Sequence, residues 1–172
     1  MELLDLIKER YSVRSYDERP IEAEKLEKIL LAAKHAPTGK NFQPQKIYVL
    51  QSEEALRKAN EVSPCIFGAP LVLLVCYDEP RAWRSPFVEG YNCGEMDATI
   101  VCDEMMLEAW SLGIGSCWVK YFDPAKLAEV FELPEKIKPV CLLTLGYSAE
   151  DSKPLEKMHN SFRPMEEIVE YL

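Results

Sequence analysis

Near its start the chain reads Arg10-Tyr11-Ser12-Val13-Arg14-Ser15-Tyr16. If this segment is extended, Arg10, Ser12 and Arg14 lie on one side, because successive side chains alternate. If it is helical, the two arginines still share a face, because residues four apart are neighbours. In either conformation two guanidinium groups and a hydroxyl converge, which is suited to holding a phosphate. The alternative is a solvated basic turn, and the rest of the chain decides between the two.

The overall composition limits the class of protein. The chain has 172 residues, 48% of them apolar and 28% charged, which predicts an ordinary soluble globular protein with a single domain over residues 1–172. The net charge of −9 argues against nucleic acid or an anionic membrane as a partner, since both require a broad basic surface. In so acidic a chain a local cluster of arginines stands out, which favours the phosphate interpretation.

The six cysteines follow no metal-binding spacing. No two of them form a C-x-x-C pair, and only two histidines could complete a cluster, so we expect no metal site. Most of the cysteines lie in apolar runs, where buried free thiols are common. No apolar run approaches twenty residues, and no secretory signal is recognisable. Together these features predict a cytoplasmic protein with reduced thiols.

The order of the expected elements is typical of an α+β fold. Apolar periodicity predicts helices over residues 2–9, 22–35, 53–61, 94–112 and 123–131, with helical spacing again at 165–172. Strands are expected over residues 46–50, 71–77, 117–119 and 138–145, and the second is apolar throughout and therefore central. This pattern predicts one central sheet of four to five strands flanked by helices. Residues 78–90 are expected to form an irregular excursion, whose role stays open.

The helix expected over residues 94–112 is apolar around most of its circumference. Its polar residues Asp97, Glu104, Glu108 and Ser111 fall on one narrow stripe. One sheet in a domain of this size cannot cover the remaining apolar surface, so we expect a second subunit to cover it in an intimate homodimer. The first helix is expected to bury Leu3, Leu4, Leu6 and Ile7.

Four motifs together resemble the small FMN-dependent nitroreductase family. They are Arg10-x-Ser12-x-Arg14, Ala36-Pro37-Thr38-Gly39-x-Asn41-x-Gln43-Pro44, Gly113-x-Gly115-Ser116-Cys117-Trp118 and Arg163-Pro164. Each motif alone is weak, but their order and spacing match over nearly the whole chain. The resemblance implies a mostly antiparallel sheet and a homodimer with the active site at the subunit interface. It also implies FMN as the cofactor and NAD(P)H as the electron donor.

The resemblance also implies roles for individual residues. The FMN phosphate and nearby ribityl oxygens would be bound by Arg10, Ser12, Arg14 and Arg163, with Tyr11 contributing through its backbone. The isoalloxazine ring would be lined by Pro37, Thr38, Gly39 and Asn41, part of this loop coming from the partner subunit, with Gln43 nearby. The subunit that binds the phosphate would also approach the ring, mostly through backbone groups of Trp118, Val119, Lys120 and Tyr121.

Two departures from the family pattern affect the pocket. Gln45 follows Gln43-Pro44 where the family often has an aromatic residue, and Lys120 stands where many members have glycine or an acidic residue. Either change could reshape the substrate site. The substrate preference of relatives is therefore not carried over.

The activity implied by the resemblance is a ping-pong oxidoreductase reaction. NAD(P)H would reduce FMN at N5 and leave, and a small electron-poor acceptor, such as a nitroaromatic or a quinone, would take its place. No catalytic side chain is expected because the flavin carries the chemistry. Two alternatives stay open: a flavin-binding protein without turnover, and other flavin chemistry such as reductive dehalogenation or flavin fragmentation. The sequence does not decide between NADH and NADPH.

Overall fold

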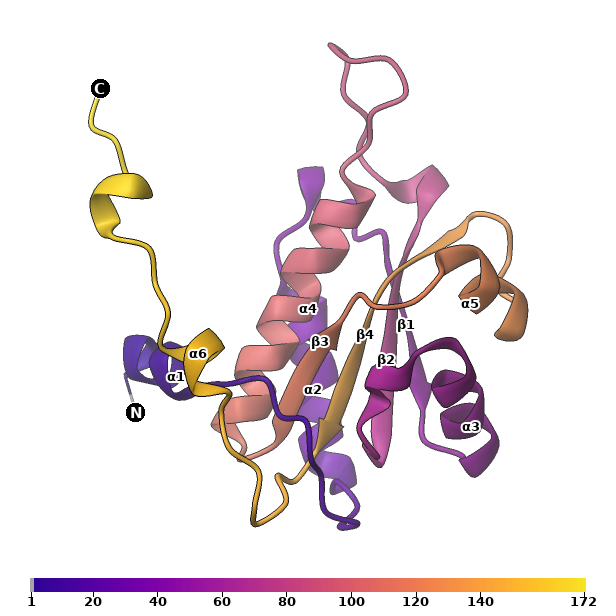
Figure 1. Cartoon of the computed structure of the whole chain (residues 1–172). Coiled ribbons are helices and arrows are strands. Elements are labelled where there is room, and N and C mark those ends of the chain that lie inside the picture. Colours follow the sequence, from indigo (N-terminus) through magenta and orange to yellow (C-terminus); the bar gives the residue numbers. More distant parts are fainter. Residues whose placement is uncertain (1) are drawn as a thin grey trace.

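The sheet has four strands, shown in Figure 1 in the computed structural model, which describes residues 2–172. They are β1 (Gln45–Leu50), β2 (Leu71–Asp78), β3 (Gly115–Val119) and β4 (Ile137–Gly146). Their order is β1-β2-β4-β3, and each neighbouring pair is antiparallel. The expected α+β class with a four- to five-stranded, mostly antiparallel sheet is confirmed.

The two central strands are buried on both faces. Leu73 and Val75 of β2 belong to one apolar core, whereas Val72 and Leu74 belong to another. Side chains alternate along a strand, so an apolar run fills a core on each side of the sheet. This arrangement explains why β2 lacks the alternation of a strand with one solvated face.

Four helices cover these two faces (Figure 1). On one face lie α2 (Ala23–His35) and α4 (Gly94–Ser111), which contribute Ile29 and Met105 to the first core. On the other lie α3 (Glu53–Val62) and α5 (Pro124–Val130), which contribute Ala59 and Leu127 to the second.

The ends of these helices follow from local chemistry. Ser52 caps α3, since its Oγ accepts a hydrogen bond from the backbone N–H of Ala55 at 3.2 Å. Asp123 caps α5 in the same way, and Pro124 occupies the first helical position. Gly113 follows α4 with a φ of +74°, the left-handed conformation that glycine adopts at a helix end.

The first helix, α1 (Leu3–Glu9), buries less than we expected. Of its four apolar residues only Leu6 is buried, whereas Leu3, Leu4 and Ile7 are exposed. The expectation was wrong because α1 lies at the margin of the fold, beside α6 (Glu156–His159), instead of on the sheet (Figure 1).

The C-terminal segment also differs from expectation. Helical spacing over residues 165–172 yields only a short 3₁₀ turn at Met165–Glu167, and Tyr171 is 95% exposed. Figure 1 shows this yellow segment running away from the sheet and its helices. An isolated amphipathic segment of this length cannot hold a helix by itself, because most helical stability comes from packing of the apolar face.

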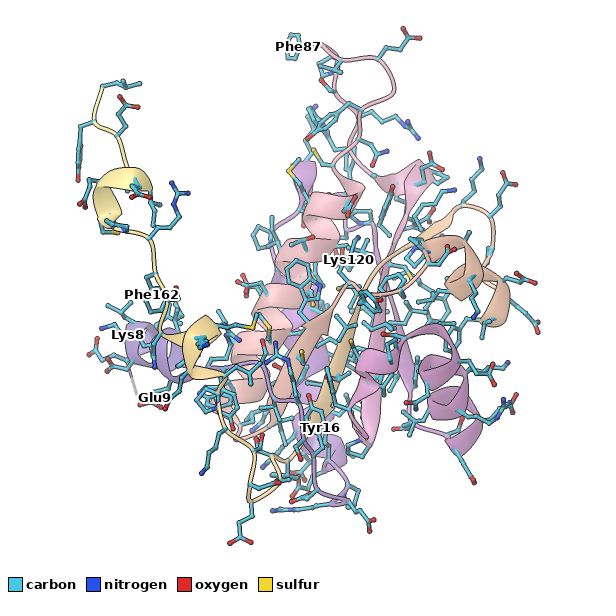
Figure 2. The ribbon with its side chains drawn as sticks, viewed as in Figure 1. Lys8, Glu9, Tyr16, Phe87, Lys120 and Phe162 are labelled. Atoms are coloured by element: carbon cyan, nitrogen blue, oxygen red, sulfur yellow. The ribbon has the colours of Figure 1, made fainter. Side chains whose placement is uncertain are left out.

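The irregular segment before α4 forms a protruding loop. It begins with a 3₁₀ turn at Glu79–Arg81 and is closed by a bridge between Arg84 and Asn92. Phe87, at its tip, is 91% exposed and points away from the body (Figure 2). The remaining 3₁₀ turns are Gly39–Asn41 and Pro64–Ile66.

No helix within residues 2–172 has both the length and the apolar character needed to cross a membrane. All six cysteines are free thiols in the structure. The cytoplasmic location stays a prediction.

Residues 10–16 are extended and dock on the free edge of β3. Ser12 forms a parallel bridge with Ser116, and the backbone N–H of Val13 donates to the Ser116 carbonyl at 2.8 Å. The Val13 side chain is fully buried. Gly115 makes room for it, since a Cβ there would lie 2.7 Å from Val13 Cγ2. The segment is therefore fixed by both backbone pairing and packing.

Tyr16 anchors the far end of this segment to β4. Its hydroxyl shares a 2.7 Å hydrogen bond with Thr144 Oγ1 and donates to the Val13 carbonyl at 3.0 Å. Burial raises the pKa of Tyr16 well above its ordinary value, so the hydroxyl stays protonated and can donate.

We predict that Tyr16→Phe lowers the free energy of unfolding by about 1–2 kcal/mol, because it leaves Thr144 and the Val13 carbonyl without this partner. Tyr171→Phe, at an exposed tyrosine, is the control and should change stability little. Urea unfolding measures both. Equal stability of the two variants would contradict the anchoring role.

Candidate functional site

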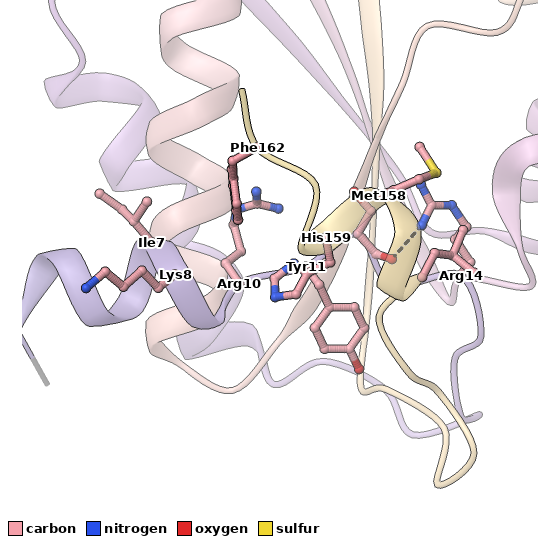
Figure 3. A pocket seen from close by; sticks show the side chains of 10 residues that line it. Ile7, Lys8, Arg10, Tyr11, Arg14, Met158, His159 and Phe162 are labelled. Carbon is pink, nitrogen blue, oxygen red and sulfur yellow. Dashed lines mark hydrogen bonds between the residues drawn. The ribbon is translucent and has the colours of Figure 1, made fainter. Parts of the chain in front are cut away.

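A cavity of about 320 Å³ opens where residues 7–14 meet the C-terminal segment (Figure 3). One wall comes from α1 and the segment after it, and the other from α6 and its surroundings. The cavity is lined by Ile7, Lys8, Arg10, Tyr11, Ser12, Arg14, Leu155, Met158, His159 and Phe162. None of these ten described residues is acidic, although the chain has a net charge of −9. The lining therefore forms a local basic region in an acidic protein.

The arginines reach the cavity because the chain leaves helical geometry at Arg10. This residue follows α1 with a ψ of 131°, and the extended backbone continues to the bridge at Ser12. Arg14 donates from one guanidinium nitrogen to the Ser12 carbonyl at 3.0 Å, as the dashed line in Figure 3 shows. Within residues 2–172 neither arginine forms an ion pair with a carboxylate. Their remaining N–H groups are suited to an anion.

The loop over residues 37–43 lies at the opposite end of α4. The backbone N–H of Gly39 donates to Asp97 Oδ1 at 2.9 Å, and the N–H of Gln43 donates to Thr38 Oγ1 at 3.1 Å. Asn41 and Gln43 both have positive φ angles, 56° and 49°. Such angles are uncommon outside glycine, so tertiary contacts hold this loop in one conformation.

The end of β3 carries the other group of predicted ring contacts. Trp118 is 45% exposed and Tyr121 72% exposed, whereas Val119 is buried. The Lys120 ammonium bonds Glu95 Oε1 and the Val140 carbonyl, both at 2.8 Å, and its position is shown in Figure 2. From Ser116, which pairs with Ser12, the strand runs about 13 Å to Lys120. These residues therefore extend away from the cavity in one direction.

The structure separates two of the predicted groups. Tyr11 packs edge-on against Trp110 in the last turns of α4, with ring centroids 5.3 Å apart, whereas Gly39 contacts Asp97 in the first turns. Trp110 follows Asp97 by thirteen positions, which span about 20 Å of helix. Within one chain, then, Pro37, Thr38, Gly39, Asn41 and Gln43 do not meet the basic cavity.

Arg163 is also outside the cavity lining. Its guanidinium donates to Glu167 Oε2 at 3.1 Å and to the Glu167 carbonyl at 3.0 Å. Its neighbour Phe162 does line the cavity. The predicted contact of Arg163 with a phosphate stays a prediction.

Comparison with known proteins identifies the family of the chain. The model of the nitroreductase family matches residues 7–65 and 61–147 of the chain. The chain belongs to the nitroreductase family.

Relatives of this nitroreductase-family chain include proteins with solved structures. A nitroreductase family protein from Clostridium difficile 630 is 42% identical, with a TM-score of 0.93 over 99% of this chain and 98% of that one. The FMN reductase [NAD(P)H] of Bacillus subtilis is 29% identical over 88% of this chain and 68% of its own length. A protein from Exiguobacterium sibiricum, solved in complex with FMN, shares the fold at 21% identity, with a TM-score of 0.84 over 100% and 98% of the two chains.

Six of the ten cavity residues belong to none of the four motifs, and three of these six carry a polar or aromatic group. These three are Lys8, His159 and Phe162. A basic residue two positions before Arg10 could have suggested Lys8. His159 and Phe162 gave no comparable signal, because the short helix α6 was not expected and only the fold brings it beside α1.

Asp97 is a correction to the sequence interpretation. We expected it on a polar stripe of the long helix, but it is only 4% exposed. One carboxylate oxygen accepts the Gly39 N–H, and the other, Oδ2, has no hydrogen-bond partner within the described residues. Helical spacing could not reveal this, because the loop over residues 37–43 folds across that part of α4.

We predict that Asp97→Leu lowers the free energy of unfolding by about 1–3 kcal/mol, because the Gly39 N–H loses its acceptor. Asp97→Asn keeps an acceptor oxygen at the same place and should lose less than half as much. Urea unfolding of the two variants measures the difference. If asparagine costs as much as leucine, the hydrogen bond to Gly39 is not what Asp97 contributes.

Proposed function

We propose that the protein is an FMN-dependent oxidoreductase that takes electrons from NAD(P)H and reduces small electron-poor acceptors such as nitroaromatics or quinones. The observation that carries the proposal is the basic cavity at residues 10–14 of an acidic chain. Family membership and the names of the relatives support it. When bound, FMN supplies the hydride chemistry, so the protein needs only to bind, orient and enclose the reactants.

The cavity residues fit a flavin phosphate. Arg10 and Arg14 offer guanidinium N–H groups, Ser12 offers a hydroxyl, and Lys8 adds a third positive charge. Charge-assisted hydrogen bonds of this kind are the strong ones in proteins. In this proposal Arg163 also binds the phosphate, after its hydrogen bonds to Glu167 break.

The flavin ring is proposed to lie along the end of β3. Trp118, Val119, Lys120 and Tyr121 extend from the strand that pairs with Ser12, so a ligand held by its phosphate at the cavity reaches them. Asn41 and Gln43 have side-chain amides that can donate to the ring's pyrimidine edge. We assign their loop to the partner subunit, as the resemblance to the family implies, since within one chain it does not line the basic cavity.

A homodimer follows from this division of the site. In a twofold arrangement each copy gives its loop over residues 37–43 to the flavin ring bound by the other, so two equal sites form. The surface supports such a dimer. Met96 and Ile100 of α4 are 50% and 40% exposed, and they lie near a second cavity of about 280 Å³ that includes Ile100 and Trp118. Large exposed apolar surfaces of this kind mark interaction sites.

Stopped-flow mixing tests the proposed activity. We expect NADH or NADPH to bleach the flavin absorption of the FMN-loaded protein, and a nitroaromatic or a quinone to restore it. Failure of both nucleotides to bleach the bound flavin would contradict the oxidoreductase proposal and leave a flavin-binding protein without turnover.

For the phosphate site, we predict that Arg10→Ala weakens FMN binding by about 1.5–3 kcal/mol, since it removes a charged hydrogen-bond donor. Arg163→Ala should have a similar effect. Arg57→Ala is the control, because Arg57 is an exposed arginine of α3 that is paired with Glu61 outside the cavity. Fluorescence titration measures the three affinities. Unchanged FMN affinity in both test variants would refute the phosphate assignment.

For the dimer, we predict that Ile100→Asp shifts the protein from dimer to monomer and lowers its FMN occupancy, because it places a charge on the proposed interface. Leu31→Asp is the matched control, since Leu31 of α2 is similarly exposed at 48% but lies outside the proposed interface. Analytical ultracentrifugation gives both masses. A wild-type monomer that is folded and fully loaded with flavin would contradict the shared site.

A further inference from the structure

The short helix α6 places a histidine on the wall of the basic cavity (Figure 3). The His159 ring lies edge-on to the Tyr11 ring, with centroids 6.3 Å apart and an interplanar angle of 76°. Tyr11 is held in turn by Trp110 and by a 3.4 Å hydrogen bond to the Ser152 carbonyl. In the described part of the chain neither ring nitrogen of His159 forms a hydrogen bond to protein. The imidazole is thus positioned by aromatic packing, and its polar atoms are available to a ligand.

Imidazole is the side chain whose charge changes near neutral pH. When it is protonated, both nitrogens donate hydrogen bonds, and a phosphate accepts such bonds strongly. We propose that His159 binds the flavin phosphate in its protonated form, so that the protein takes up a proton as it binds FMN. This inference rests on the proposed function, because it assumes that the cavity holds the phosphate.

The charged groups that line the cavity with His159 are all cations. Lys8, Arg10 and Arg14 line the same cavity, and Tyr11 is the other titratable group there. Glu156 and Lys157 share its helix, and an adjoining cavity that includes Arg14 is lined also by Asp151 and Lys153. A phosphate dianion bound beside the imidazole favours its protonated form, because opposite charges attract.

Three variants separate charge, hydrogen bonding and packing. His159→Phe keeps the ring against Tyr11 but removes the donors. His159→Gln keeps a neutral donor, and His159→Lys keeps a positive charge at every pH of interest. The matched control is His35→Phe, at the only other histidine in the sequence, in the last turn of α2.

The measurement is the dissociation constant for FMN and for riboflavin, which lacks the phosphate, at about pH 6 and about pH 8. We expect His159→Phe to weaken FMN binding about tenfold at the lower pH and less than about threefold at the higher pH. His159→Gln should show the same trend at smaller amplitude. His159→Lys should bind FMN as tightly as the wild type at the lower pH and more tightly at the higher. Titration of the free FMN phosphate is the same for every variant, so it cancels in the ratio of each variant to the wild type.

Riboflavin affinity distinguishes phosphate binding from a purely structural role. It should be unchanged in all four variants. Equal weakening of FMN and riboflavin, or a loss of FMN affinity that is the same at both pH values, would overturn the inference. If the wild type prefers FMN but His159→Phe binds it normally, only this inference fails. If the wild type binds neither flavin, the proposed function fails with it.

Discussion

The pairing of Ser12 with Ser116 is the contact on which the rest of the proposed site depends. It adds residues 10–16 to the edge of β3 and is reinforced by the buried side chain of Val13 and by the hydrogen bonds of Tyr16. The same contact places both arginines beside the start of β3, whose other end carries the predicted ring contacts. The position of the basic cavity relative to the end of β3 is therefore fixed by backbone pairing. It does not depend on the flexible arginine side chains.

Within one chain, two groups of residues of the proposed site lie apart. The cavity lies near Trp110 in the last turns of α4, whereas the loop over residues 37–43 is held by Asp97 in the first turns. The exposed residues of α4 and the extended C-terminal segment leave apolar surface without cover in the single chain, including Met96, Phe162 and Tyr171. A second copy would cover such surface and, in the proposed dimer, bring its loop over residues 37–43 to the flavin ring. The apolar character of the long helix and the division of the site thus have the same proposed explanation.

Much of the fold was predictable because its signals are local. The apolar runs of β2 and β4, the periodicity of α2 and the left-handed glycine after α4 each act within a few residues. The grouping of Arg10, Ser12 and Arg14 was predictable because an extended backbone places them on one side. The burial of Asp97 and the position of His159 were not, because both depend on segments far apart in sequence. The marginal packing of α1 was missed for the same reason: periodicity shows which face is apolar but not what covers it.

The most direct test of the central claim compares the affinities of the wild-type protein for FMN and riboflavin. The two ligands share the ring system and differ in the phosphate, so their ratio isolates the contribution of the basic cavity. Two or more charge-assisted hydrogen bonds predict that FMN binds at least about a hundredfold more tightly. Equal affinities, or tight binding of neither ligand, would contradict a phosphate site at residues 10–14.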